Sequence, residues 1–247
     1  MRFSNKTVMI IGATGGIGSI TAKKISEEGG NLILAARDIS KLEQLQNDLK
    51  TKSIIQSIDA TKYDELQKAV QAGESEFGKI DILIHAVGSI VLKSFQTTSE
   101  EILREILELN LVSPFLSIKA VLNGMLKNKS GSIVVISSVA GSTGLTNHEA
   151  ISAAKGGLEA MIRSSAITYA KRGIRFNAVA LGLVDTPMAN FLTSNESTLK
   201  VSQSLHPMGR IGTPDDVVEG ILYLSSDNSK WTTGVVLPID GGMAAGK

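Results

Sequence analysis

A glycine-rich segment near the N-terminus has the composition of a phosphate-binding loop. It runs from Gly12 to Gly18, directly after the apolar run 8–11 and directly before a stretch with helical spacing. Glycines in such a place allow a tight turn and a close approach of the backbone to a pyrophosphate, and the following helix presents free N–H groups to the anion. A glycine-rich turn alone is weak evidence, but its place between a strand and a helix predicts a dinucleotide site.

The end of the second apolar run bears on which dinucleotide binds. About 20 residues after the glycine-rich loop, NAD-binding folds place an acid against the ribose hydroxyls. The sequence has Ala36 at this point, followed by Arg37. A guanidinium can bind a 2′-phosphate through two hydrogen bonds, so Arg37 favours NADP(H), with NAD(H) as the other possibility. Two observations weigh against this interpretation: neighbouring Asp38 can neutralise the charge, and Arg37 can be an ordinary solvated side chain.

Short β-branched runs alternate along the chain with longer segments of helical spacing. The expected strands are 8–11, 32–35, 54–58, 82–84, 133–136, 176–180 and 235–239. The expected helices include 17–28, 40–49, 63–77, 100–126 and 149–171. Crossovers long enough to contain a helix imply right-handed βαβ units and a parallel sheet covered on both faces. The sequence therefore predicts an α/β protein, a single-domain Rossmann fold over residues 1–247 with a doubly wound seven-stranded parallel sheet.

The composition argues against several classes of function. Lys and Arg number 25 against 24 Asp and Glu, so no overall charge attracts nucleic acid or an anionic membrane. The absence of cysteine removes disulfides, thiolate catalysis and cysteine-based zinc sites, and only three histidines are present. No uninterrupted apolar stretch reaches the roughly 18 residues of a membrane span, and the first residues have the pattern of a strand entering a turn. We expect a soluble, cytoplasmic protein without a metal, a nucleic-acid partner or a membrane.

The least regular part of the expected fold is segment 187–213. It mixes polar and apolar residues and precedes a helix that Pro214 and Asp215 can start. Long irregular segments beside a binding site often close over the substrate, so we expect a substrate lid here. The alternative is a surface helix and loop without a gating role.

Taken in order along nearly the whole chain, these residues resemble the short-chain dehydrogenase/reductase family, and most closely its β-ketoacyl carrier-protein reductase branch. Residues 12–18 match the family's Gly-x-x-x-Gly-x-Gly pattern, and His85-Ala86-Val87-Gly88 stands where the family has Asn-Asn-Ala-Gly. Asp59 matches the acid that holds the adenine, and Val184 and Thr186 match the segment that contacts the nicotinamide amide. The resemblance implies cofactor contacts at Gly12, Thr14, Gly16, Ile17, Gly18, Arg37, Asp59, Ala86, Lys155, Val184 and Thr186.

The resemblance also implies a catalytic centre. Ser138 matches the serine that holds the substrate oxygen, and Asn110 matches the helix asparagine that braces the site. Lys155 matches the lysine that binds the nicotinamide ribose and lowers the pKa of a tyrosine four residues earlier in the chain. The residue at that position is Ile151, which has no proton to give.

None of the three tyrosines is a plausible replacement. Tyr169 stands 14 residues beyond Lys155 in the sequence, about 21 Å along the same expected helix. Tyr63 and Tyr223 belong to other expected helices, away from the carboxyl edge of the sheet.

A histidine is the most plausible substitute proton donor. His148 stands three residues before Ile151, so the two side chains share one helical face. With Asn147 as the expected helix cap, His148 falls in the first turn, where the helix dipole favours a neutral ring that polarises a carbonyl as a donor. His85 is a weaker second candidate. We expect His206, in the mobile segment, to be a surface or lid residue rather than a catalyst.

Two functions follow as hypotheses. The first is an atypical NAD(P)(H)-dependent oxidoreductase of a small carbonyl or alcohol substrate, with His148 or a water molecule as proton source. The second is a catalytically silent cofactor-binding pseudoenzyme that acts as a sensor or partner subunit. The expected helix 149–171 is rich in small residues that permit close helix packing, and family members are commonly tetramers, so we expect a homotetramer.

Overall fold

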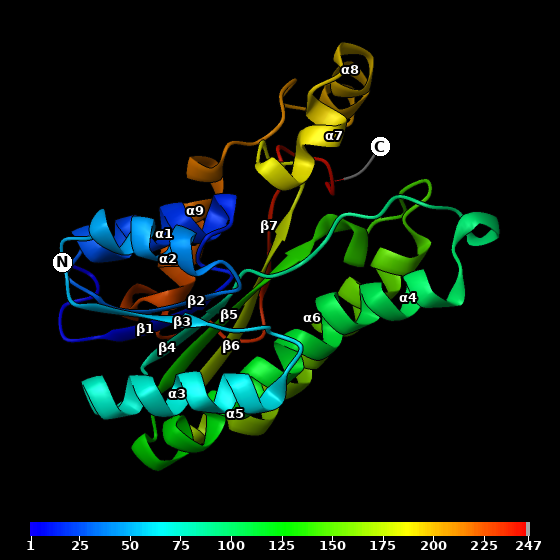
Figure 1. Ribbon diagram of the computed structural model, residues 1–247. Helices are drawn as coiled ribbons and strands as arrows, with labels where there is room; N and C mark the ends of the chain where they lie inside the picture. Colours follow the sequence, from blue (N-terminus) through cyan, green and yellow to red (C-terminus); the bar gives the residue numbers. More distant parts are fainter. Residues whose placement is uncertain (246–247) are drawn as a thin grey trace.

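The computed structural model, which describes residues 1–245, is built around a seven-stranded parallel sheet. The strands lie in the order β3-β2-β1-β4-β5-β6-β7 (Figure 1). Their bounds are β1 Thr7–Ile11, β2 Asn31–Ala36, β3 Ser53–Ser57, β4 Ile82–His85, β5 Gly131–Ser138, β6 Ile174–Leu181 and β7 Val236–Ile239. Because the order changes direction between β1 and β4, the sheet is doubly wound, as the sequence predicts. The carboxyl ends of these two strands form the switch point, where such sheets bind ligands.

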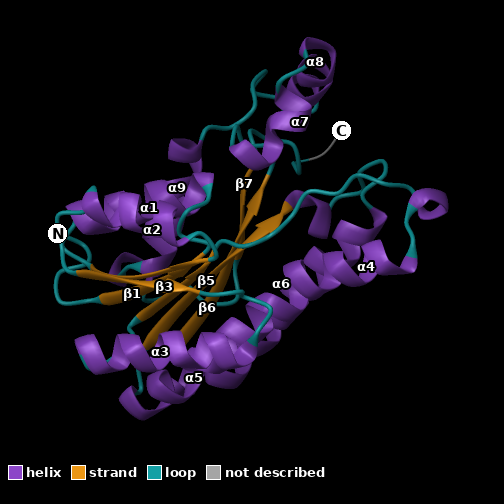
Figure 2. Cartoon of the chain, in the orientation of Figure 1, coloured by secondary structure: helices purple, strands orange, loops and turns teal. Residues whose placement is uncertain are grey.

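Helices cover both faces of the sheet (Figure 2). Their bounds are α1 Gly16–Glu27, α2 Ile39–Asn47, α3 Tyr63–Phe77, α4 Glu100–Leu107, α5 Ser113–Asn128, α6 Glu149–Tyr169, α7 Asn190–Thr193, α8 Glu196–Ser204 and α9 Pro214–Ser225. Successive side chains of a strand point to opposite faces, so Met9 and Ile11 pack in the core under α3, α5 and α6, while Val8 and Ile10 pack under α1, α2 and α9. Strands buried on both faces explain the continuous apolar runs of the sequence.

The expected helix 100–126 is interrupted around Asn110. Residues Glu108–Val112 form a π-helical turn between α4 and α5. The side-chain amide of Asn110 in this turn donates to the carbonyl oxygen of Ile106 at 3.0 Å. The stretch Glu100–Asn128 is long and apolar enough for a membrane span, with a mean hydropathy of 1.3. In the structure Ile118 and other buried side chains of α5 belong to the sheet core, so this is a core helix.

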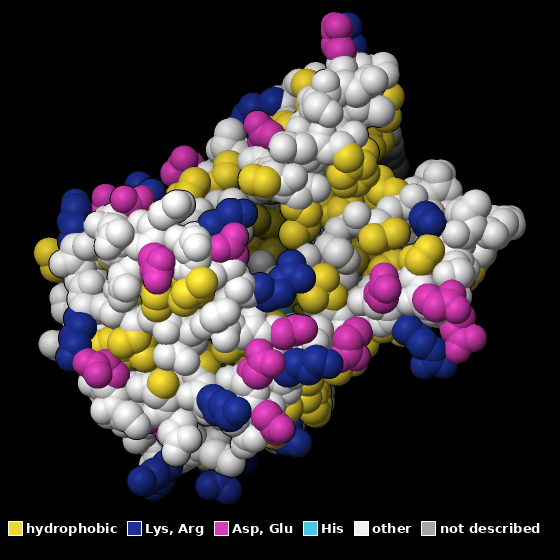
Figure 3. All heavy atoms as spheres, in the orientation of Figure 1, with side chains coloured by type: hydrophobic (Ala, Val, Ile, Leu, Met, Phe, Trp, Pro, Cys, Tyr) yellow, Lys and Arg dark blue, Asp and Glu magenta, His cyan; other side chains and the backbone are white. Residues whose placement is uncertain are grey.

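Segment 187–213 is more regular than the sequence predicts. It contains a short 3-10 turn and the helices α7 and α8. The side chain of Asn195 accepts hydrogen bonds from the backbone N–H groups of Ser197 and Thr198, which starts α8. Four large apolar side chains of this segment remain exposed: Met188, Phe191, Val201 and Met208. Figure 3 shows a hollow below α7 and α8, with hydrophobic side chains on its walls.

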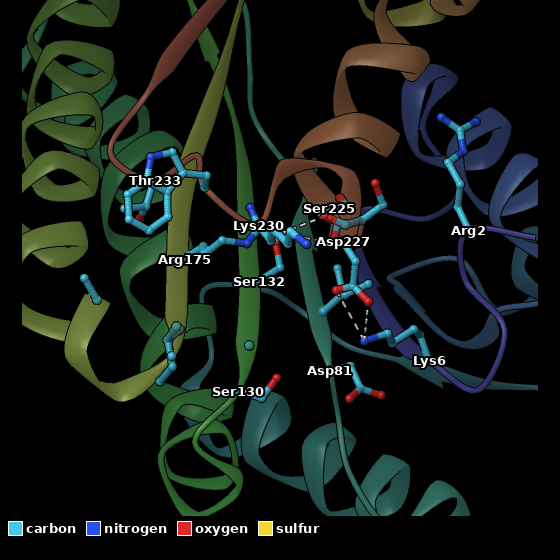
Figure 4. Close-up of a pocket in the computed structure, with 17 residues that line it drawn as sticks. Arg2, Lys6, Asp81, Ser130, Ser132, Arg175, Ser225, Asp227, Lys230 and Thr233 are labelled. Atoms are coloured by element: carbon cyan, nitrogen blue, oxygen red, sulfur yellow. Dashed lines mark hydrogen bonds and ion pairs between the residues drawn. The ribbon is translucent and has the colours of Figure 1, made fainter.

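A cavity of about 550 Å³ opens at the amino edge of the sheet, opposite the switch point (Figure 4). Its polar groups largely satisfy one another. Arg175 donates to the carbonyl oxygens of Leu224 and Thr232, and Lys6 pairs with Asp227 at 3.1 Å. The chemically distinctive residues meet instead at the carboxyl edge of the sheet, which is the candidate functional site.

Candidate active site

The glycine-rich loop lies directly against two other segments at the carboxyl edge. Gly12 has φ +85°, and a Cβ there would stand 2.9 Å from the carbonyl carbon of Ala86, just beyond β4. A Cβ on Gly16 would stand 2.9 Å from Cγ2 of Thr186, which follows β6. Without side chains at these glycines, the loop backbone lies directly against Ala86 and Thr186, and we call these three segments together the cradle. This cradle fits the backbone approach that a dinucleotide requires.

The start of α1 offers hydrogen-bond donors to this cradle. No side chain caps the helix at Gly15, so the first N–H groups are available to an anion. Thr14 and Ile17 are half-buried, and Gly18 is buried against the backbone of Gly12. Across the cradle, Val184 is buried and forms a parallel bridge with Gly212. The structure therefore brings the sequence-predicted loop and nicotinamide segments to one place.

The side chains after β2 and β3 are those for which the sequence predicts contacts with the adenosine part of the cofactor. Arg37 is exposed and forms no ion pair with any residue of the described range 1–245. The carboxylate of Asp38 accepts from the backbone N–H of Lys41 at 3.1 Å and so caps α2, which commits it to that helix rather than to Arg37. Asp59 accepts from the N–H and hydroxyl of Thr61, and the backbone hydrogen bond is the main reason that its pKa is lowered.

Asn110 and Lys155 converge beyond β4. A Cβ on Gly88 would lie 3.0 Å from Oδ1 of Asn110 and 3.6 Å from Nζ of Lys155. Asn110 is fully buried: its Oδ1 accepts from the N–H of Ser89, and its Nδ2 donates to the Ser89 hydroxyl at 2.9 Å. Lys155 Nζ donates to the carbonyl oxygen of Ile136 at 2.9 Å. Ser138 ends the same strand two residues later, so β5 carries it to the same edge of the sheet as Lys155.

Burial controls the charge of this site. Desolvation lowers the pKa of Lys155 to about 8, and the negative charge of Glu159 opposes the shift. Burial, followed by the positive charge of Lys155, lowers the pKa of His85 to about 3. His85 is therefore neutral in the physiological range, and its ring contacts the hydroxyls of Ser117 and Ser113 inside the fold.

Ile151 is a packing residue in this structure. It is 5% exposed and belongs to a small apolar cluster with Ile106, Ala140 and Ala154. The tyrosines lie elsewhere, as the sequence predicts: Tyr169 stacks on Phe176, Tyr63 lies under Lys119, and Tyr223 contacts Thr232. No tyrosine hydroxyl among these contacts reaches the site.

The expected geometry of His148 is wrong in one respect. Asn147 does not cap α6; it adopts φ +60°, which asparagine tolerates, and His148 stands at the N-cap position without a side-chain capping bond. Nδ1 of His148 lies 2.7 Å from the carbonyl oxygen of Thr146. A carbonyl oxygen only accepts, so Nδ1 holds the hydrogen and the free Nε2 of a neutral ring is an acceptor. His148 can therefore donate to a substrate only after it is protonated.

Of the two expectations for His206, the surface position is wrong. The residue is 3% exposed, and both of its ring nitrogens have backbone partners. Nδ1 donates to the carbonyl oxygen of Ser202 at 2.7 Å, and Nε2 accepts from the N–H of Leu183 at 3.1 Å. His206 thus joins the end of α8 to the chain that leaves β6.

Three residues of the site were not expected from the sequence. Ser89 holds Asn110, as described above, and Ser137 donates its hydroxyl proton to Oε1 of Glu159 at 2.8 Å. Glu159 is 2% exposed, and burial raises its pKa. An acid one helical turn after Lys155, among small and apolar residues, is the sequence signal that could have indicated it.

Comparisons with known proteins match nearly the whole chain. The family model described as enoyl-(acyl carrier protein) reductase matches residues 12–244. The chain is 32% identical to cis-4-hydroxycyclohexanecarboxylate dehydrogenase of Sinomonas cyclohexanicum, over 98% of each protein. It is 34% identical to the 3-oxoacyl-(acyl-carrier-protein) reductase FabG of Thermotoga maritima, over 98% of this chain and 99% of that protein.

Two solved structures have nearly the same shape. Levodione reductase superposes with a TM-score of 0.91 at 27% identity and covers 100% of both chains. ElxO with NADP bound superposes with a TM-score of 0.91 at 26% identity, over 98% of this chain and 99% of that one.

Proposed function

Because the chain belongs to the short-chain dehydrogenase/reductase family of NAD(P)-dependent oxidoreductases, we propose that it interconverts a carbonyl and an alcohol at the site of Asn110, Ser138 and Lys155. The observation that supports this most directly is the convergence of Lys155 and Asn110 on Gly88, beside the strand end that bears Ser138. The substrate is a small molecule, and the preferred cofactor is NADP(H) rather than NAD(H).

In this proposal the cradle binds the cofactor. The backbone around Gly12, Gly16 and Ala86 binds the pyrophosphate side, and Val184 and Thr186 bind the nicotinamide side. The remaining contacts are those of Thr14, Ile17, Gly18, Asp59 and Lys155. Arg37 binds the 2′-phosphate, since the carboxylate of Asp38 is engaged in capping α2. When bound, the nicotinamide gives or takes a hydride.

The protein residues orient the substrate and manage one proton. The Ser138 hydroxyl donates to the substrate oxygen, and Lys155 and Asn110 hold the ribose and ordered water. The proton comes from His148 or from water, because Ile151 stands where the family places a tyrosine. Since the neutral ring of His148 offers an acceptor at Nε2, His148 serves alcohol oxidation directly and carbonyl reduction only as the imidazolium.

Segment 187–213 is the substrate lid in this proposal. Its exposed apolar residues include Met188 and Phe191. Figure 3 shows hydrophobic side chains on the walls of the hollow below α7 and α8, where a substrate would enter. The names of the two relatives give different substrates, a hydroxycyclohexanecarboxylate for one and a 3-oxoacyl group on a carrier protein for the other. Membership of the family therefore does not identify the substrate.

A substrate screen tests the activity. Purified protein is offered NADPH or NADH with a panel of aldehydes and ketones, and the oxidised cofactors with secondary alcohols. Turnover of at least one pair, faster with the phosphorylated cofactor, supports the proposal. Tight NADPH binding with no turnover on any substrate favours the pseudoenzyme that senses the cofactor or supports a partner, and the buried packing of Ile151 is the observation in its favour.

We also propose a cytoplasmic homotetramer. Ile167 on α6 and Phe115 on α5 are exposed, at 85% and 52%, on helices that otherwise pack against the sheet. Burial of such side chains between subunits is favourable. Light scattering at working concentration decides it, and a monomer contradicts the proposal.

A further inference from the structure

Two consecutive residues at the end of β5 bond to two residues of α6 that stand one helical turn apart. The carbonyl oxygen of Ile136 accepts from Lys155, and the hydroxyl of Ser137 donates to Glu159. We propose that Glu159 is a positioning residue, whose buried carboxylate fixes the turn that bears Ser138 and acts as the counter-charge of Lys155. The inference deepens the proposed function, on which its catalytic meaning rests.

The Glu159 carboxylate lies against the turn that follows Ser138. Residues Val139–Gly141 form a 3-10 turn, capped by the Ser138 side chain, which accepts from the N–H of Ala140. A Cβ on Gly141 would lie 2.5 Å from Oε1 of Glu159 and 3.1 Å from the carbonyl carbon of Lys155. The Glu159 carboxylate therefore contacts the chain on both sides of Ser138: it accepts from Ser137 before it and packs against Gly141 after it.

Glu159 stands one helical turn after Lys155 and carries the opposite charge. Two titratable groups outside this pair interact with it: His85 with Lys155, and Arg163 with Glu159. His85 is held neutral by its burial, so it adds no positive charge beside Lys155. Glu159 is the group that raises the pKa of Lys155 against desolvation. Removal of its charge favours the neutral amine.

In this protein the charge of Lys155 acts on the cofactor ribose and ordered water, because position 151 holds no tyrosine on which it could act. With Ile151 in place, no phenol stands between Lys155 and the substrate, and the ammonium is the cation that ribose hydroxyls and ordered water meet. Charge-assisted hydrogen bonds are roughly twice as strong as neutral ones. A residue that keeps Lys155 charged therefore supports cofactor binding without touching the cofactor.

The test of the charge needs neither substrate nor cofactor. Isotope-labelled lysine side chains are titrated by NMR in the cofactor-free protein, and the Lys155 signal is assigned from its loss in Lys155→Met. We expect Glu159→Gln, which keeps the size of the side chain, to lower the Lys155 titration midpoint by about one pH unit. The matched control is Glu105→Gln on α4, where the exposed carboxylate forms no hydrogen bond or ion pair within the described part of the chain. An unchanged midpoint in Glu159→Gln, or an equal shift in Glu105→Gln, overturns the inference.

The contact with the turn is tested by a double-mutant cycle. Gly141→Ala places a methyl group against the carboxylate and is expected to lower the melting temperature by about 5 °C. In a Glu159→Ala background the carboxylate is gone and only the 3.1 Å approach to the carbonyl carbon of Lys155 remains. The same change is then expected to cost about half as much or less. Equal costs in both backgrounds contradict the contact. Failure of the proposed function is distinguished by a different result, which is the absence of NADPH binding by the unmodified protein.

Discussion

The ammonium of Lys155 donates a 2.9 Å hydrogen bond to the carbonyl oxygen of Ile136, so helix α6 is joined to strand β5 two residues before Ser138. Lys155→Met removes this donor and the ribose contact that we assign to it. We expect NADPH affinity to fall about 10-fold to 100-fold, the value of one or two hydrogen bonds to a charged group. Fluorescence titration measures it, with the exposed Lys127→Met as control; equal affinities of the two variants would contradict the assignment.

The same lysine makes stability depend on pH. Its pKa is lowered to about 8 in the folded protein from 10.5, so the unfolded chain binds more protons between these values. The free energy of unfolding therefore rises as the pH increases from about 8 to about 10.5, by at most about 3 kcal/mol. Below pH 8 the cost of the buried charge is fully present. Denaturant unfolding should show Lys155→Met more stable than the parent at pH 7, with a smaller gap at high pH; a constant gap is the contrary result.

Arg37 should discriminate between the two nicotinamide nucleotides. Its side chain has no acidic partner within residues 1–245, and Asp38 is engaged at the start of α2. Arg37→Ala is expected to weaken NADPH binding about 10-fold to 100-fold and to leave NADH binding unchanged. Calorimetry with both nucleotides measures this, with Lys41→Ala as control. An equal loss for both nucleotides points to a general effect on the cradle.

The proton source can be located with two variants. Ile151→Tyr restores a phenol one helical turn before Lys155 and is expected to raise turnover about 10²-fold to 10⁴-fold, the usual contribution of a general acid. The larger ring is expected to cost about 1 to 3 kcal/mol, because Ile151 is packed against Ile106 and Ala140.

His148→Ala is the second variant of this pair. If His148 moves the proton, turnover falls when the change is made in the parent, while Ile151→Tyr/His148→Ala keeps the activity of Ile151→Tyr. Unchanged turnover in His148→Ala leaves water as the source.

The strands and most helices could be predicted because their signals are local. Val8–Ile11 and Leu32–Ala35 are continuous β-branched or apolar runs, and helix 63–77 has the same bounds in the sequence and in the structure. The cradle was also predictable, since glycine-rich turns have a fixed place after the first strand.

The unpredicted features depend on contacts between distant residues or on backbone detail. Ser137 and Glu159 are 22 residues apart, and only the packing of α6 on β5 brings them together. Asn147 adopts a left-handed conformation, so His148 rather than Asn147 takes the N-cap position of α6, and this changes the chemistry open to His148. Periodicity also cannot reveal that both nitrogens of His206 find backbone partners.

A change of chain length at the π-helical turn Glu108–Val112 affects the site and the fold differently. A π turn is one residue longer than the α-helical turn it replaces. Deletion of a single residue between α4 and α5 would therefore let one uninterrupted helix form, with both flanks still in phase with the sheet. Such a shortened chain should fold and yet lose the placement of Asn110. An insertion or deletion in this turn is therefore expected to remove the activity while the Rossmann domain still folds.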